Sequence, residues 1–378
     1  MAGSGWLAVA HRQPRRSSAA PSPEWHAYGA LQATPSPSLP LTPVGVRLGV
    51  RTGLRLPFSG TVPGWWDADS GRLTYIHPVP PPQANGYGFF ALSRAGGFAA
   101  LRPSQEPCDG CPGPPEPVEL VSPTGLARLG PLGNEIAPGA APDSVWITRY
   151  HLPAVPSRDP RQFAVTEQVD LRSRVLTSPV QLPPGVHVLR GVHAGLLLAY
   201  GQGKQEVIYV WDPVTGRSTI LIPVQLEIAA TAELMVWRDS CPAQQRCFLH
   251  VTNLVTGRQR DYTAPQANYN EGSISPDGRY LALDVLEDPD HTPGHQGNYL
   301  STAVVVMDLA TGRISPVPGS KIASNSNSDV SYYVPAWSAD SNYLAIQTGL
   351  LPALWRVGSP RLWLLPALPV DNPVVTGY

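Results

Sequence analysis

Short apolar runs separated by turn residues make up the chain from about residue 44 onward. In the segment 44–56, Val46, Leu48 and Val50 alternate with small or polar residues. A period of two positions is the pattern of a strand with one buried face. No apolar run approaches the roughly 18 residues that a membrane-spanning helix requires. The pattern therefore predicts an all-β protein built from many short strands.

One eight-residue pattern recurs as VWDPVTGR at 210–217, VTNLVTGR at 251–258 and VMDLATGR at 306–313. In each copy an Asp or Asn can accept hydrogen bonds from the backbone that follows it, and the glycine can take a positive φ. Each copy therefore predicts a turn between two antiparallel strands. Weaker copies begin at Ser122 and Asp170, so that successive turns are roughly 40 to 55 residues apart. This spacing is typical of propeller blades of about four strands.

A second repeat alternates with the first along the chain. The segment SPDGRYLAL at 275–283 aligns with SADSNYLAI at 338–346, and DADSGRLTY at 67–75 fits the same register. We interpret all three as a turn centred on an Asp and followed by a strand. Each blade then has an early turn between its first strands and a late turn between its last strands.

Together, the Ser-Pro-Asp-Gly-Arg-Tyr-Leu-Ala hairpin and the Asp-Leu-Ala-Thr-Gly-Arg turn resemble those of the TolB-like or WD40-like bacterial β-propellers. The resemblance covers roughly residues 60 to 370 and is clearest from about residue 190. It implies a single propeller of four-stranded antiparallel blades, six most simply and seven as the alternative. Members of such families mostly bind or scaffold, and the resemblance carries over no catalytic residue.

Composition agrees with this architecture and adds an N-terminal extension. The 378 residues include 44 prolines and 35 glycines, a load that excludes a helical bundle. Residues 1–43 are rich in Pro, Ser and Ala, which predicts a flexible tether, and the propeller domain is expected over 44–378. We expect the alternating segment 44–56 to close the ring by pairing with the C-terminal blade. Four tryptophans are expected to pack between blades: Trp66, Trp211, Trp237 and Trp337.

Charge and motifs give little indication of catalysis. The 27 basic and 28 acidic residues are balanced, so a general nucleic-acid footprint is absent. No Gly-x-Ser-x-Gly nucleophile elbow occurs. No tryptophan follows the Thr-Gly turns closely, which argues against quinone binding, so no cofactor is expected. We therefore expect a protein that is not an enzyme.

The most ligand-like segment is an acidic insert between two predicted strands. It offers nitrogen and oxygen donors, but its prolines and glycines favour an irregular loop over a preformed metal cage. We interpret it as a solvated loop that can serve in recognition, and we expect no metal site. Its polar residues are Glu287, Asp288, Asp290, His291 and His295.

The four cysteines form two close pairs, Cys108 with Cys111 and Cys241 with Cys247. Two local disulfides are the favoured interpretation, free thiols the second and a zinc site the third. Disulfides would place the protein outside the reducing cytoplasm, in a secreted or envelope-tethered form. A cytoplasmic location is the alternative, because no signal peptide is visible.

These observations predict a monomeric, non-catalytic binding or scaffolding propeller that acts through the loops of one face. Its partner, a protein or a small ligand, is not specified by the sequence. One alternative is a hydrolase or lyase with a site at the mouth of the central channel. Another is the sensor domain of a membrane-anchored signalling protein.

Overall fold

The computed structural model describes residues 52–58, 64–67, 69–70, 72–75, 88–92, 98–101, 115–122, 125–150, 164–202, 205–224, 226–238, 247–264, 268–287, 301–320, 322–323, 335–348 and 351–364. Regular structure within these ranges is entirely β, as expected. None of them forms a helix long and apolar enough to cross a membrane. The predicted tether, residues 1–43, lies outside them.

The described strands form seven antiparallel sheets, each made from consecutive strands of the chain. Sheet 1 has β1 (Arg55–Phe58), β2 (Gly64–Asp67) and β3 (Arg72–Tyr75). Sheet 2 has β4 (Gly88–Leu92), β5 (Phe98–Leu101), β6 (Glu116–Ser122) and β7 (Gly125–Gly133). Sheet 3 has β8 (Glu135–Pro138), β9 (Ser144–Tyr150), β10 (Ala164–Asp170) and β11 (Val180–Gln181).

Four further sheets follow in the same manner. Sheet 4 has β12 (Val186–Val192), β13 (Gly195–Gln202), β14 (Gln205–Trp211) and β15 (Ser218–Val224). Sheet 5 has β16 (Leu226–Ala230), β17 (Leu234–Arg238), β18 (Cys247–Asn253) and β19 (Gln259–Ala264). Sheet 6 has β20 (Asn268–Ile274), β21 (Tyr280–Glu287), β22 (Ser301–Asp308), β23 (Ile314–Pro316) and the short β24 (Ile322–Ala323). Sheet 7 has β25 (Ala336–Trp337), β26 (Tyr343–Thr348), β27 (Leu351–Arg356) and β28 (Leu362–Leu364).

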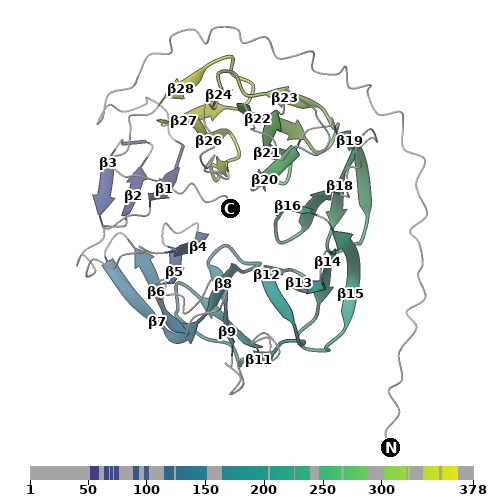
Figure 1. Ribbon diagram of the computed structural model, residues 1–378. Helices are drawn as coiled ribbons and strands as arrows, with labels where there is room; N and C mark the ends of the chain where they lie inside the picture. Colours follow the sequence, from purple (N-terminus) through teal and green to yellow (C-terminus); the bar gives the residue numbers. More distant parts are fainter. Residues whose placement is uncertain are drawn as a thin grey trace, which may run out of the picture.

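The sheets stand around a central axis, and in sheets 2 to 6 the first strand, β4, β8, β12, β16 or β20, lies nearest the axis (Figure 1). These first strands contact one another across neighbouring sheets, as β4 does with β8, β8 with β12, and β16 with β20. Four first strands also share an irregularity: β4, β12, β16 and β20 each have a register shift against the second strand. A bulge increases local twist, which helps the inner edge of a sheet bend around the axis.

The hydrophobic core lies between neighbouring sheets. Between sheets 5 and 6, for example, Val236 and Leu249 pack against Leu283 and Met307. Trp211, Trp237 and Trp337 are buried in the layers between sheets 3 and 4, 4 and 5, and 6 and 7. The packing role expected for these three tryptophans is confirmed. Inner strands therefore have apolar residues on both faces and show little alternation of apolar with polar positions, because each face meets a neighbouring sheet.

The described part of segment 44–56 does not behave as expected. Among the described strands, β1 (55–58) pairs with β2 and no other, and β28 is the last strand of sheet 7. The C-terminal residues supply four strands of their own sheet, and 55–56 belong to sheet 1 instead. Residues 44–51 lie outside the described part of the chain.

Candidate functional site

The late turns are local structures built around one side chain. In sheet 4, Asp212 accepts hydrogen bonds from the backbone N–H of Val214 (2.9 Å) and the hydroxyl of Thr215 (2.7 Å). The turn closes when the N–H of Gly216, at φ 69°, donates to the carbonyl of Asp212. The hydrogen bonds to the carboxylate, first that from the Thr215 hydroxyl and then that from the Val214 N–H, lower the pKa of Asp212. The same bonding surrounds Asn253 in sheet 5 and Asp308 in sheet 6, which confirms the predicted repeat.

Two less regular copies have the same design. Asp170 accepts hydrogen bonds from the N–H of Arg172 and Ser173, but Arg174, with φ 58°, occupies the position that glycine holds in sheets 4 to 6. Asp67 accepts from the N–H and hydroxyl of Ser70. The turn at 67–72 therefore has the bonding of a late turn, not of the early turn with which its sequence was aligned. The misalignment arose because Asp67 and Asp69 both fit an Asp-centred turn.

Early turns depend on a serine and an aspartate. In sheet 6, the Ser275 hydroxyl donates to Asp277 (2.5 Å) and accepts from the N–H of Tyr280 (2.8 Å). In sheet 7, Ser338 makes the same two bonds with Asp340 and Tyr343. The aligned pair of segments at 275 and 338 is therefore confirmed as a repeat.

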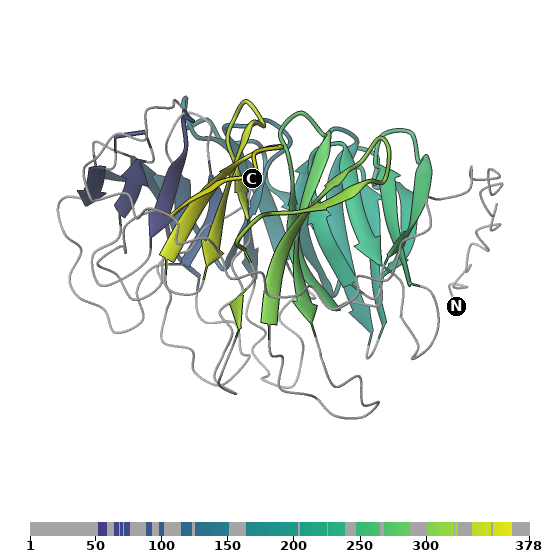
Figure 2. The same cartoon turned by 90° about the horizontal axis from the view of Figure 1, so that it is seen from above.

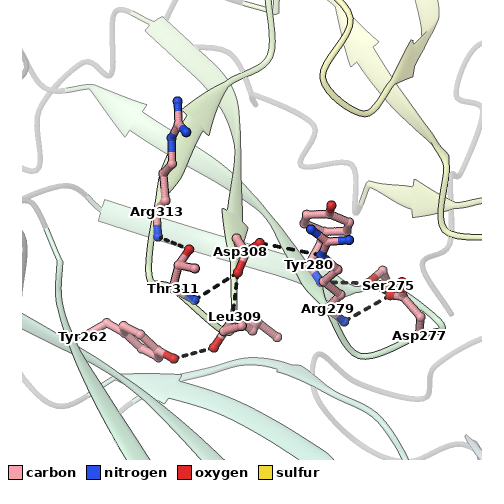
Figure 3. Close-up of polar contacts among 10 residues, drawn as sticks. Tyr262, Ser275, Asp277, Arg279, Tyr280, Asp308, Leu309, Thr311 and Arg313 are labelled. Atoms are coloured by element: carbon pink, nitrogen blue, oxygen red, sulfur yellow. Dashed lines mark hydrogen bonds and ion pairs between the residues drawn. The ribbon is translucent and has the colours of Figure 1, made fainter.

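Early and late turns of one sheet meet at the same end. In sheet 6 the N–H of Leu309 donates to the carbonyl of Arg279 (2.8 Å), and the Arg279 guanidinium lies 3.6 Å from Asp308 (Figure 3). Tyr262 reaches across from sheet 5 and donates its hydroxyl to the carbonyl of Leu309. The equivalent backbone bond joins Leu254 to Glu233 in sheet 5 and Val357 to Asn342 in sheet 7. We call this end of the sheets the turn face; its polar groups are largely committed to holding its own backbone.

The opposite ends of the strands carry the long connections, and we call this side the loop face. Four connections between second and third strands open here, at 102–115, 151–163, 239–246 and 288–300. Glu287 and Cys247, the two predicted site residues that are described, stand at strand ends on this side. Of the predicted recognition residues, Glu287 ends β21, opposite Ser301 of β22. Asp288, Asp290, His291 and His295 lie outside the described residues.

The predicted disulfides also belong to these connections. Cys247 is the first residue of β18 and pairs in register with Ala264. Cys108, Cys111 and Cys241 fall outside the described residues, so both pairings stay predictions. In the part of the chain that is described, no group of three or more His, Cys, Asp or Glu side chains is placed to hold a metal ion.

Sequence reasoning missed a buried histidine between sheets 4 and 5. The Nδ1 atom of His250 lies 2.8 Å from Asp261, and its ring stacks on Trp237 with 4.0 Å between centroids. The Gln259 amide nitrogen completes the cluster, 3.2 Å from Nδ1 and donating to Asp261 over 2.6 Å. The alternation of β18 could have placed this residue, because His250 shares a face with Phe248 and Thr252.

Asp284 is the second residue that the sequence did not single out. It lies on β21 opposite Val304, on the face whose Ala282 packs in the layer against sheet 7. Burial raises the pKa of Asp284 to about 7, against a smaller opposing effect of the Val285 N–H. A carboxyl group that titrates near neutrality can transfer a proton in a reaction. Such a raised pKa is also a common consequence of burial alone.

Comparisons with known proteins identify the fold. No protein-family model and no curated protein sequence matches the chain. Among solved structures, it is similar to the β-propeller domain of the Trilobed protease from Pyrococcus furiosus, which has an open velcro topology: 9% identity, 84% of this chain and 94% of the other, TM-score 0.53. It is also similar to an oligogalacturonate lyase in complex with manganese: 13% identity, 83% of this chain and 86% of the other, TM-score 0.53.

TolB from Acinetobacter baumannii is a further match, with 11% identity over 82% of this chain and 63% of that one and a TM-score of 0.42. The C-terminal WD40 domain of Sif2 matches with 10% identity. The expected resemblance to propeller families is confirmed by the β-propeller domain that matches with a TM-score of 0.53. At these identities the likeness shows the fold alone, and the fold is a β-propeller.

Proposed function

We propose that this chain is a non-catalytic binding or scaffolding propeller whose binding surface is the loop face. In this proposal each of the seven sheets is one blade, the alternative to the six that the sequence favoured. Sheet 1 then resembles the others without one of its four strands.

The observation that supports this function is the unequal character of the two faces. Turns such as 212–217 and 275–279 are short and satisfy their own polar groups. On the loop face, sheets 2, 3, 5 and 6 each insert eight or more residues between two central strands. Long insertions on a rigid scaffold commonly carry recognition, whereas they add little to stability.

A direct test uses a matched pair of variants. One replaces residues 288–298 by two glycines, and the other shortens the loop at 151–163 in the same way. Both should unfold within about 1 to 2 kcal/mol of the parent, as expected for surface changes. Captured proteins or small molecules should be lost from at least one variant in native pull-downs compared by mass spectrometry. Identical capture by both variants and the parent would refute binding through these two loops.

Location is part of the same proposal. A disulfide between Cys241 and Cys247 in protein taken from its native compartment would support an extracytoplasmic site. Non-reducing peptide mapping decides this, and two alkylatable thiols would favour the cytoplasm.

A further inference from the structure

Three neighbouring sheets expose apolar side chains at their late turns. Val175 and Leu176 in sheet 3 are 62% and 41% exposed, Val214 in sheet 4 is 91% exposed and Val255 in sheet 5 is 55% exposed. Among the described residues, these four are most of the large hydrophobic side chains that reach solvent. We call segments 170–176, 212–217 and 253–258 the turn arc.

Exposure of these valines follows from how the turns are built. The N–H of Val214 is held by Asp212, and that of Val255 by Asn253 (3.1 Å), so the backbone of each turn is fixed with the side chain outward. Sheets 1 and 6 have Asp69 and Ala310 at this turn position. The fold therefore does not require valine there. Valine at this position in sheets 4 and 5, with Val175 three residues further along the turn of sheet 3, concentrates apolar surface on one arc.

The turn arc also carries exposed arginine side chains that can contact a partner. Arg174, Arg217 and Arg258 are exposed at the ends of the three turns. Within the described residues, no carboxylate forms an ion pair with any of them. Two acidic groups nearby are engaged, Asp212 with its own turn and Asp143 with Arg172 (2.5 Å), and the exposed Glu233 carboxylate lies 3.5 Å from Nε2 of His193.

The geometry of the arc suits a flat partner. Its three turns belong to consecutive sheets and all lie at the turn face, where Figure 2 shows the coloured turns along one edge of the ring. Each turn offers one or two apolar side chains beside an arginine. Small apolar tips flanked by arginine match the headgroup region of a bilayer, where apolar groups enter and guanidinium groups meet phosphate.

We propose that the turn arc docks on an anionic lipid surface, with Val175, Val214 and Val255 entering the headgroup region and Arg174, Arg217 and Arg258 pairing with lipid phosphates. This goes beyond the proposed binding function, which uses the opposite face. A lipid-docked propeller would present its loop face away from the membrane.

Vesicle co-sedimentation tests the proposal with the full chain. The probes are vesicles of phosphatidylglycerol and phosphatidylcholine in equal parts, and vesicles of phosphatidylcholine alone. The parent should bind the anionic vesicles and lose binding as salt is raised. Replacing Arg217 and Arg258 together by Gln should weaken binding by about fivefold for each arginine removed. The double variant Val214→Ser/Val255→Ser should bind anionic vesicles several-fold more weakly, while its binding depends on salt concentration as that of the parent does.

The matched controls are Arg356→Gln and Leu132→Ser, which alter an exposed arginine and an exposed leucine outside the arc. Both should bind vesicles as the parent does, and all variants should share its unfolding midpoint. Absence of vesicle binding by the parent would overturn the proposal. So would equal losses in the control variants. Binding to soluble polyglutamate without binding to vesicles would also overturn it, in favour of an acidic protein partner.

Discussion

The backbone N–H of Asp277 donates a hydrogen bond to the hydroxyl of Ser341, 3.1 Å away, and so joins the early turn of sheet 6 to that of sheet 7. Ser341 adopts φ 61°, a conformation that costs a residue with a Cβ roughly 1 kcal/mol. Gly278 holds the equivalent place in sheet 6 with φ 70°. Ser341 therefore has a strained backbone at the position where its hydroxyl bonds to the neighbouring sheet.

Two substitutions at Ser341 separate the strain from the hydrogen bond. Ser341→Ala keeps the strain and loses the bond, so it should lower the free energy of unfolding by about 1 kcal/mol. Ser341→Gly loses the bond but relieves the strain, so it should lie within about 0.5 kcal/mol of the parent. Denaturant unfolding measures both. If the glycine variant is as unstable as the alanine variant, the backbone at 341 is not strained.

A second strained residue predicts a stabilising change. Arg174 is exposed with φ 58°, at the turn position that is glycine in sheets 4 to 6. Arg174→Gly should raise the free energy of unfolding by about 1 kcal/mol, since the backbone bond from residue 174 to Asp170 does not depend on the side chain. The reverse change, Gly216→Arg, should lower it by a similar amount, because a Cβ at Gly216 meets no atom within 4 Å. An unchanged midpoint for both variants would refute the argument.

The turns were predictable because their causes are local. An Asx side chain, a nearby Thr and a glycine at 212–216 determine the hydrogen bonds within a few residues of one another, and the same holds at 253 and 308. The turn at 67–72 was misaligned since two aspartates in sequence offer two registers and only the bonding of Ser70 selects one. Local chemistry fixes the turn but not which strands flank it.

Long-range pairing and side-chain surroundings were not predictable in this way. The alternation of segment 44–56 indicates a strand, but it carries no information on its partner, and β1 pairs with β2. His250 and Asp284 depend on which sheet lies against each face, and a single sequence does not specify this. The recognition residues of the loop at 288–300 were chosen for their chemistry, and only the position of Glu287 can be compared with the structure.

Asp284 predicts a pH dependence of stability. Its folded pKa, raised by burial to about 7 from an ordinary 3.8, means that the folded state holds a proton that the unfolded state has released between these values. Its unfavourable effect is therefore absent below about pH 4, grows as pH rises and is complete above about pH 7, on the order of 4 kcal/mol. Asp284→Asn should stabilise the protein at pH 8 and flatten this dependence. Equal curves for variant and parent from pH 4 to 8 would contradict it.

Asp212 predicts the opposite pH dependence, a loss of stability in acid. The hydrogen bonds from Thr215 and the Val214 N–H lower its pKa below 3.8, so its stabilising effect is present above the unfolded value and lost as pH falls through the folded one. Asp212→Asn should keep the turn, as Asn253 does in sheet 5. Because asparagine does not titrate, the free energy of unfolding of this variant should fall less than that of the parent as the pH is lowered from 4 to 2. Asn253→Asp is the matched change and should add acid sensitivity in denaturant titrations.

The glycines of the late turns should differ in how well they tolerate a methyl group. Gly257 and Gly312 have nearly equal φ values of 69° and 74°, so alanine carries the same backbone strain at both, about 1 kcal/mol. Around Gly257 a Cβ would meet nothing within 4 Å, whereas at Gly312 it would lie 2.6 Å from Cδ1 of Tyr262.

Gly312→Ala should therefore cost about 1 to 3 kcal/mol more than Gly257→Ala, because the Tyr262 ring must move and its hydroxyl is held by Leu309 of the next sheet. Tyr262→Leu in the Gly312→Ala background should recover part of this extra cost, although it removes the hydrogen bond. A double-mutant cycle measured by denaturant unfolding gives the coupling between the two positions. Equal costs for Gly257→Ala and Gly312→Ala would show that the tyrosine does not pack on the turn, and that sheets 5 and 6 are held together without it.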